Sequence, residues 1–258
     1  MVKLREELAR RLNKTQEVKH NTYPVRQMAE QLLMLSDEQL GRYAFLHEPL
    51  KGKFDTEQKN NYIRLANECG QQTANEMRSL LQQQAGTTAL TIEELPSAIA
   101  EELGISIKEE SVPCGDGHVI FAQFVEPDQV MVFSDCLDRL NELVRREQMD
   151  DLFSGIDFRN VLLAHELFHA IEHRQKDHIF TQTEKIELWK RPFSNKSTIL
   201  ALSEMAAMAF AREICCLSFS PYVLDVLLIV QYSLEAACAL YEEIMTAADV
   251  PLITQTGE

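Results

Sequence analysis

The first third of the chain has apolar residues three and four positions apart, which is typical of amphipathic helices. Helices are expected at residues 1–14, at residues 24–35, after a capping serine at Ser36, and at residues 55–84. A run of Gln, Ala, Gly and Thr then ends the helical pattern. We therefore predict an N-terminal helical block at residues 1–88. It is either a regulatory or substrate-recruiting module or a helical layer packed on the rest of the chain.

The spacing of apolar residues changes after Gly104, which closes a predicted helix at residues 91–103. Residues 105–109 alternate between apolar and polar, as a half-buried strand does. Residues 118–125 and 129–133 are rich in β-branched and aromatic residues and are joined through Glu-Pro-Asp, so we predict a hairpin. The expected result is a small sheet of about three strands.

Helical spacing returns in the second half of the chain. Helices are predicted at residues 135–145, 161–173, 198–213 and 221–245. The polar stretch between the second and third of them is expected to be an irregular connection that forms a lid or a substrate wall. The predicted fold class is therefore α+β, with a mainly helical domain and a small β-sheet at residues 89–258, preceded by the N-terminal helical block.

Composition and charge limit the function. The chain has 258 residues, enough for one large domain or two modest ones, and a formal net charge of −15. Such a charge argues against general affinity for nucleic acid or for anionic membranes, and it permits a basic protein partner. No export signal and no membrane span are evident, and the six cysteines show no CxxC spacing. We therefore predict a cytoplasmic protein with reduced thiols, with no membrane and no direct nucleic-acid contact.

The predicted helix at residues 161–173 contains His-Glu-x-x-His, a spacing found in zinc metalloproteases. Residues four apart lie one turn apart on the same face of a helix, so His165 and His169 can both reach one metal ion. Glu166 is one position further round the helix, beside the metal, where it suits a base that acts on a water molecule. Apolar residues surround the motif, as a buried active-site helix requires.

A zinc site needs a third protein ligand. A third histidine ten positions after the first is absent, because Gln175 stands there. Glu204 is the best candidate, since a lone carboxylate in an otherwise apolar helix is rarely buried unless it is paired or bound to metal. Glu213 in the same helix suits the solvent edge. Three other carboxylates are alternatives that lie close after the motif or in the polar connection: Glu172, Glu184 and Glu187.

The order of these features resembles the ImmA/IrrE family of intracellular zinc metallopeptidases, within the gluzincin group. The resemblance covers roughly residues 89–221. It rests on Ala-His-Glu-Leu-Phe-His at residues 164–169 and on Glu-Met-Ala-Ala-Met-Ala-Phe-Ala at residues 204–211, with Leu-Gly-Ile at residues 103–105 as weaker support. The chain departs from the family pattern at Phe168, where members commonly have a small residue, and in its long connection between the two helices.

The resemblance implies a zincin-like fold in which His165, His169 and Glu204 bind Zn²⁺ and Glu166 is the catalytic base. It also implies a specific protein substrate, often a helix-turn-helix transcriptional repressor. The expected function is that of a zinc-dependent endopeptidase of the gluzincin type. A second donor to the oxyanion is needed besides the metal, and the candidates are Tyr222, Tyr232, Tyr241, His173 and His178.

Two other functions are compatible with the same residues. The protein is alternatively a non-hydrolytic zinc-binding sensor or interaction module on the same fold, or a pair of structural helices that binds no metal. The presence of Glu166 favours the peptidase, because metal binding alone does not need that carboxylate.

Overall fold

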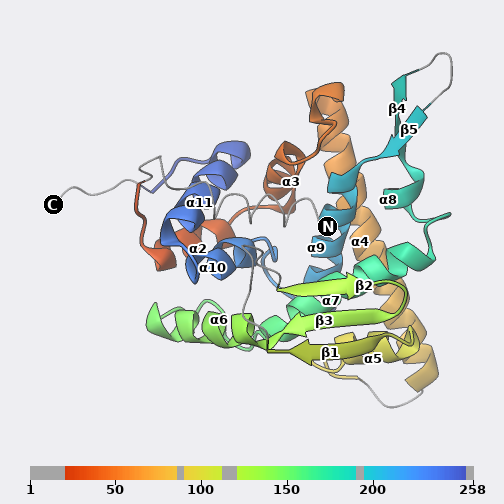
Figure 1. The fold of residues 1–258 in the computed structure, drawn as a ribbon, viewed down its shortest axis with the longest axis horizontal. Helices are drawn as coiled ribbons and strands as arrows, with labels where there is room; N and C mark the ends of the chain where they lie inside the picture. Colours follow the sequence, from red (N-terminus) through yellow and green to blue (C-terminus); the bar gives the residue numbers. More distant parts are fainter. Residues whose placement is uncertain (1–20, 86–89, 112–120, 190–194, 254–258) are drawn as a thin grey trace.

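The computed structural model describes residues 21–85, 90–111, 121–189 and 195–253, and these are mostly helical (Figure 1). The helices are α2 (Val25–Leu33), α3 (Asp37–Leu46), α4 (Thr56–Ala85), α5 (Leu95–Glu102), α6 (Ser134–Arg146), α7 (Phe158–Arg174), α8 (Phe180–Thr183), α9 (Leu200–Ile214), α10 (Val223–Val230) and α11 (Leu234–Ala248), with a 3-10 turn at Lys51–Lys53. The strands are β1 (Ser106–Glu110), β2 (Ala122–Val125), β3 (Gln129–Phe133), β4 (Lys185–Trp189) and β5 (Asn195–Thr198). The α+β class is as predicted.

The three-stranded sheet has the order β1-β3-β2. The predicted hairpin is confirmed for β2 and β3, which are antiparallel with Val125 opposite Gln129, whereas residues 118–120 lie outside the described part of the chain. β1 is parallel to β3. β2 is therefore an edge strand of this sheet, and it lies beside the motif helix α7 (Figure 1).

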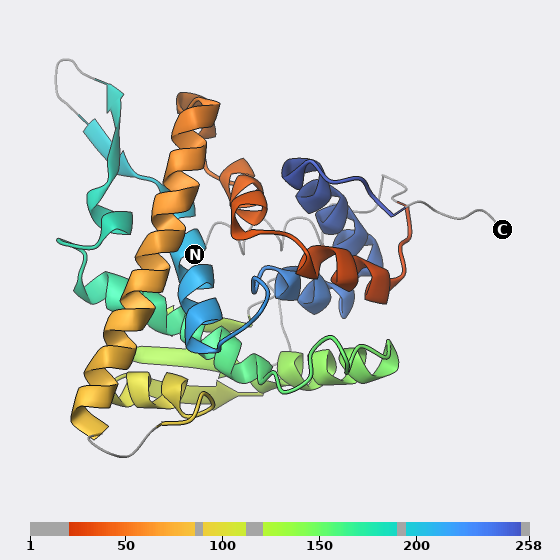
Figure 2. The same ribbon diagram turned by 180° about the vertical axis from the view of Figure 1, so that it is seen from behind.

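The long helix α4 runs alongside α9 (Figure 2). Its predicted extent is confirmed to within one residue at each end. Small residues of α9 allow the close approach, and buried side chains of both helices, such as Ile63 and Phe210, belong to one hydrophobic core. The N-terminal segment and the motif-bearing segment are thus packed together over a shared apolar interior. The boundary near residue 88 remains a prediction.

Local capping signals were predictive near the N-terminus. The predicted cap at Ser36 is confirmed. Ser36 accepts a hydrogen bond from the backbone of Gln39, whose side chain accepts one from the Ser36 backbone, so the cap is part of a capping box at the start of α3. The helix predicted at residues 91–103 begins later, at Leu95, because Thr91 and the next residues form a turn. The helix predicted at residues 1–14 lies outside the described residues.

Two predictions for the second half were wrong. The polar stretch at residues 176–196 is not an irregular connection, because its described part forms α8 and an antiparallel pair of strands, β4 and β5. The helix predicted at residues 221–245 is two helices, since the chain turns before Ser233, whose side chain caps α11 by accepting a hydrogen bond from Ala236 N. Among the described helices, none is long and apolar enough to cross a membrane.

Candidate metal centre

Helix α7 holds the motif in the interior. Asp157 caps its first turn by accepting a hydrogen bond from Arg159 N at 2.9 Å. The turns that carry the motif are buried on all sides, so His165 and His169 have exposed fractions of only 8 % and 5 %. Their Nε2 atoms lie 3.2 Å apart. The helical spacing therefore brings the two ring nitrogens to one point.

Helix α9 brings Glu204 to the same point. Its Oε2 atom lies 3.6 Å from His165 Nε2, and the side chain is buried. One ligand atom from each of His165, His169 and Glu204 lies within 4.8 Å of the others. In a tetrahedral zinc site with bonds of 2.0–2.1 Å, ligand atoms stand about 3.3 Å apart. Two nitrogens and one carboxylate oxygen at these separations fit a shared zinc ion.

The charges around this group favour a cation at its centre. Burial by itself raises the pKa of Glu204, but hydrogen bonding to His165 and the charge of His169 hold that pKa well below its ordinary value. Burial by itself lowers the pKa of His169, yet the nearby carboxylates outweigh burial and raise it. A buried carboxylate therefore stays ionised because positive charge is close to it, and a bound divalent cation supplies such charge.

Glu166 lies beside the group of three and does not belong to it. The side chain is 1 % exposed, and its Oε2 atom accepts a hydrogen bond from Phe124 N of β2 at 2.7 Å. The edge strand thus holds the carboxylate between the sheet and α7. Glu166 lines one cavity together with His165 and Glu204, so its carboxylate adjoins two members of the group.

Glu172, one of the alternative ligands, lies on the other side of His169. It accepts hydrogen bonds from Thr181 Oγ1 at 2.5 Å and from Ser203 Oγ at 2.7 Å. Its Oε2 atom is 3.5 Å from His169 Nδ1, and Ser203 Oγ is 3.2 Å from the same nitrogen. Glu172 and Ser203 thus hold the rear nitrogen of the ring, which leaves Nε2 directed at the centre.

Sequence reasoning missed this arrangement. Glu172 follows His169 by three positions on one helix, which was a usable signal, whereas the contribution of Ser203 from another helix had none. The two remaining alternatives lie elsewhere. Glu184 accepts a hydrogen bond from Tyr62 Oη at 2.8 Å, and Glu187 lies opposite Lys196 in the β4–β5 pair.

The five residues considered as hydrogen-bond donors to the oxyanion lie in different parts of the fold. The Tyr222 hydroxyl is buried with no hydrogen-bond partner among the described residues, and burial followed by the charge of Glu204 raises its pKa well above the ordinary value. Tyr241 donates to Gln31, and His173 pairs with Glu126 at 3.3 Å. The ring of Tyr232 lies under the guanidinium of Arg139, 5.7 Å from its centroid, and the backbone N–H of His178 donates to Gln175 O. Tyr222 is thus the candidate donor whose pKa is affected by the charge of Glu204.

The bulky side chain of Phe168 does not narrow the space next to His165 and Glu204. It is completely buried, and its ring centroid lies 5.7 Å from that of Phe210. The side chain fills the interface between α7 and α9, so the departure from the family pattern concerns packing. The space next to the metal group is lined by other residues.

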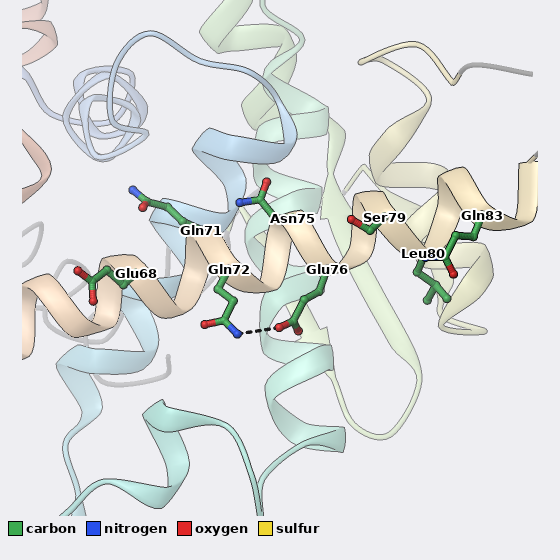
Figure 3. Close-up of a pocket in the computed structure, with 8 residues that line it drawn as sticks. All are labelled: Glu68, Gln71, Gln72, Asn75, Glu76, Ser79, Leu80 and Gln83. Carbon is green, nitrogen blue, oxygen red and sulfur yellow. Dashed lines mark hydrogen bonds between the residues drawn. The ribbon is translucent and has the colours of Figure 1, made fainter.

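A separate hollow follows the outer face of α4 (Figure 3). Nearly all of its side chains are polar, and Gln72 donates to Glu76 within it at 2.8 Å. None of its residues belongs to the His-His-Glu group. This surface is a solvated helix face.

Comparisons with models of known protein families, with curated protein sequences and with solved structures found no match. The interpretation of the centre therefore rests on its own geometry and on the sequence motif.

Proposed function

We propose that the protein is a zinc-dependent endopeptidase that cuts a specific protein substrate. The observation that carries the proposal is the buried convergence of His165, His169 and Glu204, with the carboxylate of Glu166 beside them. A purely structural metal site has four protein ligands, whereas a catalytic one has three and leaves one position open. Three described ligand candidates and a neighbouring base are the set that hydrolysis needs.

Each residue has a distinct role in the proposed reaction. His165, His169 and Glu204 would hold the zinc, which when bound supplies a Lewis acid that polarises a carbonyl and lowers the pKa of water. Glu166 takes a proton from the attacking water and passes it to the leaving amine. The hydrogen bond from Phe124 N keeps that carboxylate in place.

The proposed substrate is a protein, such as a helix-turn-helix regulator, and the proposed location is the cytoplasm. The regulator follows from the family resemblance alone. The net charge of −15 supports a protein partner over nucleic acid or an anionic membrane. Every cysteine in the described segments is a free thiol, which suits a reducing compartment.

The decisive experiment compares new protein N-termini in cells that carry the wild type or Glu166→Gln. Cuts that depend on Glu166 are expected, and a single cut in a DNA-binding regulator would identify the substrate. Glu213→Gln is the matched control, because this residue lies at the far end of α9 and is not in the metal group. Identical N-termini in wild type and Glu166→Gln, with zinc bound in both, would favour the non-hydrolytic sensor.

A further inference from the structure

An apolar cavity of about 50 Å³ opens beside the metal group. The side chains of His165, Glu166 and Glu204 form one part of its wall. Most of the remaining wall is apolar, from Phe121, Val161, Leu162, Met208, Leu224 and Leu228. The cavity thus adjoins both the metal-binding atoms and the proposed base.

Two apolar residues of this wall lie on the same helices as Glu166 and Glu204. Leu162 lies one turn before Glu166 on α7, and Met208 lies one turn after Glu204 on α9. Leu228 comes from α10 and is 1 % exposed. Three packed helices therefore set the shape of the cavity before any substrate arrives, and such preformed sites select ligands by fit.

The size of the cavity favours an aliphatic occupant. An apolar cavity of about 150 Å³ holds benzene, and this one has about 50 Å³. A branched aliphatic side chain gains free energy from leaving water for such a surface, at about 25 cal/mol per Å² of apolar area. A benzyl group is larger than an isobutyl group, so it fits less well in a cavity one third as large as the one that holds benzene.

The charge of the cavity disfavours acidic occupants. Besides Glu166 and Glu204, the wall includes the carboxylate of Asp225. An aspartate or glutamate side chain would bring a further negative charge into a partly desolvated space, where like charges repel more strongly than in water. A lysine or arginine would find a partner in Asp225, but its side chain is longer than a cavity of about 50 Å³ can hold, and its charge would lose hydration among the leucines.

We infer that this cavity receives an uncharged aliphatic side chain of the substrate, next to the peptide bond that is cut. The inference rests on the proposed function and specifies its substrate class: proteins with Val, Leu, Ile or Met at one fixed position beside the cleavage site. Leu162, Met208 and Leu228 are the specificity-determining residues.

The first test is direct binding and needs no turnover. Zinc-loaded wild type is titrated in a calorimeter with three hydroxamic acids that differ only in an isobutyl, a benzyl or a carboxymethyl side chain. The isobutyl compound is expected to bind at least about tenfold more tightly than the other two, which is the discrimination typical of a shaped apolar pocket.

Leu162→Trp fills the cavity from a half-buried position and should remove the preference for isobutyl. Leu234→Trp is the matched control, since Leu234 is 39 % exposed at the start of α11 and is not part of the wall. Zinc content and thermal unfolding establish that both variants are folded. A preference that survives Leu162→Trp unchanged would overturn the inference.

The second test maps cleavage sites in a mixture of proteome-derived peptides exposed to wild type or Glu166→Gln. Glu166-dependent cuts with aliphatic residues at one fixed position support both proposals. Glu166-dependent cuts that favour aromatic, basic or acidic residues there would overturn the cavity assignment and leave the peptidase standing. Tight isobutyl binding without any Glu166-dependent cut would support the cavity and count against the peptidase.

Discussion

Gly70 of α4 lies directly against the carbonyl oxygen of Ala206 in α9, so closely that a Cβ atom on Gly70 would stand 2.1 Å from that oxygen. It would also lie 2.9 Å from the Cβ atom of Ala209. The neighbouring atoms are backbone and a short side chain, which cannot move away as the end of a long side chain can. The contact lies two residues beyond Glu204, so the helix that carries this carboxylate is seated on α4.

Gly70→Ala is therefore expected to destabilise the protein by about 1–3 kcal/mol, as overpacking does. This loss exceeds the gain of up to about 1 kcal/mol that alanine brings to a helix interior. Urea unfolding followed by circular dichroism measures the difference. Gly52→Ala is the control, because a Cβ atom there meets nothing within 4 Å. An unchanged or raised free energy of unfolding for Gly70→Ala would contradict the close approach.

Metal binding should depend on the three converging residues. One zinc per chain is expected by elemental analysis, and His165→Ala, His169→Ala or Glu204→Ala should abolish it at micromolar metal. Free zinc at a thousand times Kd should stabilise the wild type by about 4 kcal/mol, and a chelator should remove that gain. Glu213→Ala tests specificity within α9 and should retain the metal. Zinc retained by His165→Ala would point to a different ligand set.

Glu172 should affect zinc affinity without binding zinc. Glu172→Gln keeps the volume but removes the negative charge that lies 3.5 Å from His169 Nδ1, so the ring loses part of its orientation and basicity. The Kd for zinc should rise by about 10- to 100-fold, as for other outer-shell partners. A competition titration with a chromogenic chelator measures it.

Glu76→Gln provides the comparison for Glu172→Gln, because that carboxylate lies on the outer face of α4 (Figure 3). It should leave the Kd unchanged. Equal effects of the two substitutions would show that Glu172 does not position His169.

Two adjacent cysteines should differ in reactivity. Burial first, and then the nearby Asp157 and Cys216, raise the pKa of Cys215 to about 12, so its thiol remains protonated at lower pH. Alkylation requires the thiolate, so a thiol that stays protonated reacts slowly. Cys216, in contrast, is exposed to the reagent. Iodoacetamide at about pH 8 should therefore label Cys216 and spare Cys215. Tandem mass spectrometry locates the label, and both thiols should react in urea. If Cys215 in the folded protein were labelled before Cys216, the result would contradict the burial of Cys215.

The parts of the fold that follow from local chemistry were predictable. The cap at Ser36, the length of α4 and the β2–β3 hairpin each depend on residues close together in the chain. Non-local features were not. The apolar pattern at residues 221–245 suggests one long helix, but the chain breaks before Ser233. The polar pattern at residues 176–196 suggests a loop, but its described part includes the β4–β5 pair. Tertiary packing decided both.

The sequence by itself determined the chemistry that α7 offers, since helical geometry places His165, Glu166 and His169 in fixed relation to one another. It also singled out Glu204, because a lone carboxylate in an apolar helix is costly to bury without a cation. Only the tertiary structure decided that α9 delivers Glu204 to within 3.6 Å of His165, that Glu172 and Ser203 lie behind His169, and that an apolar cavity adjoins the centre. These relationships join residues on different helices, and the distance between helices is set by how side chains pack across the whole core.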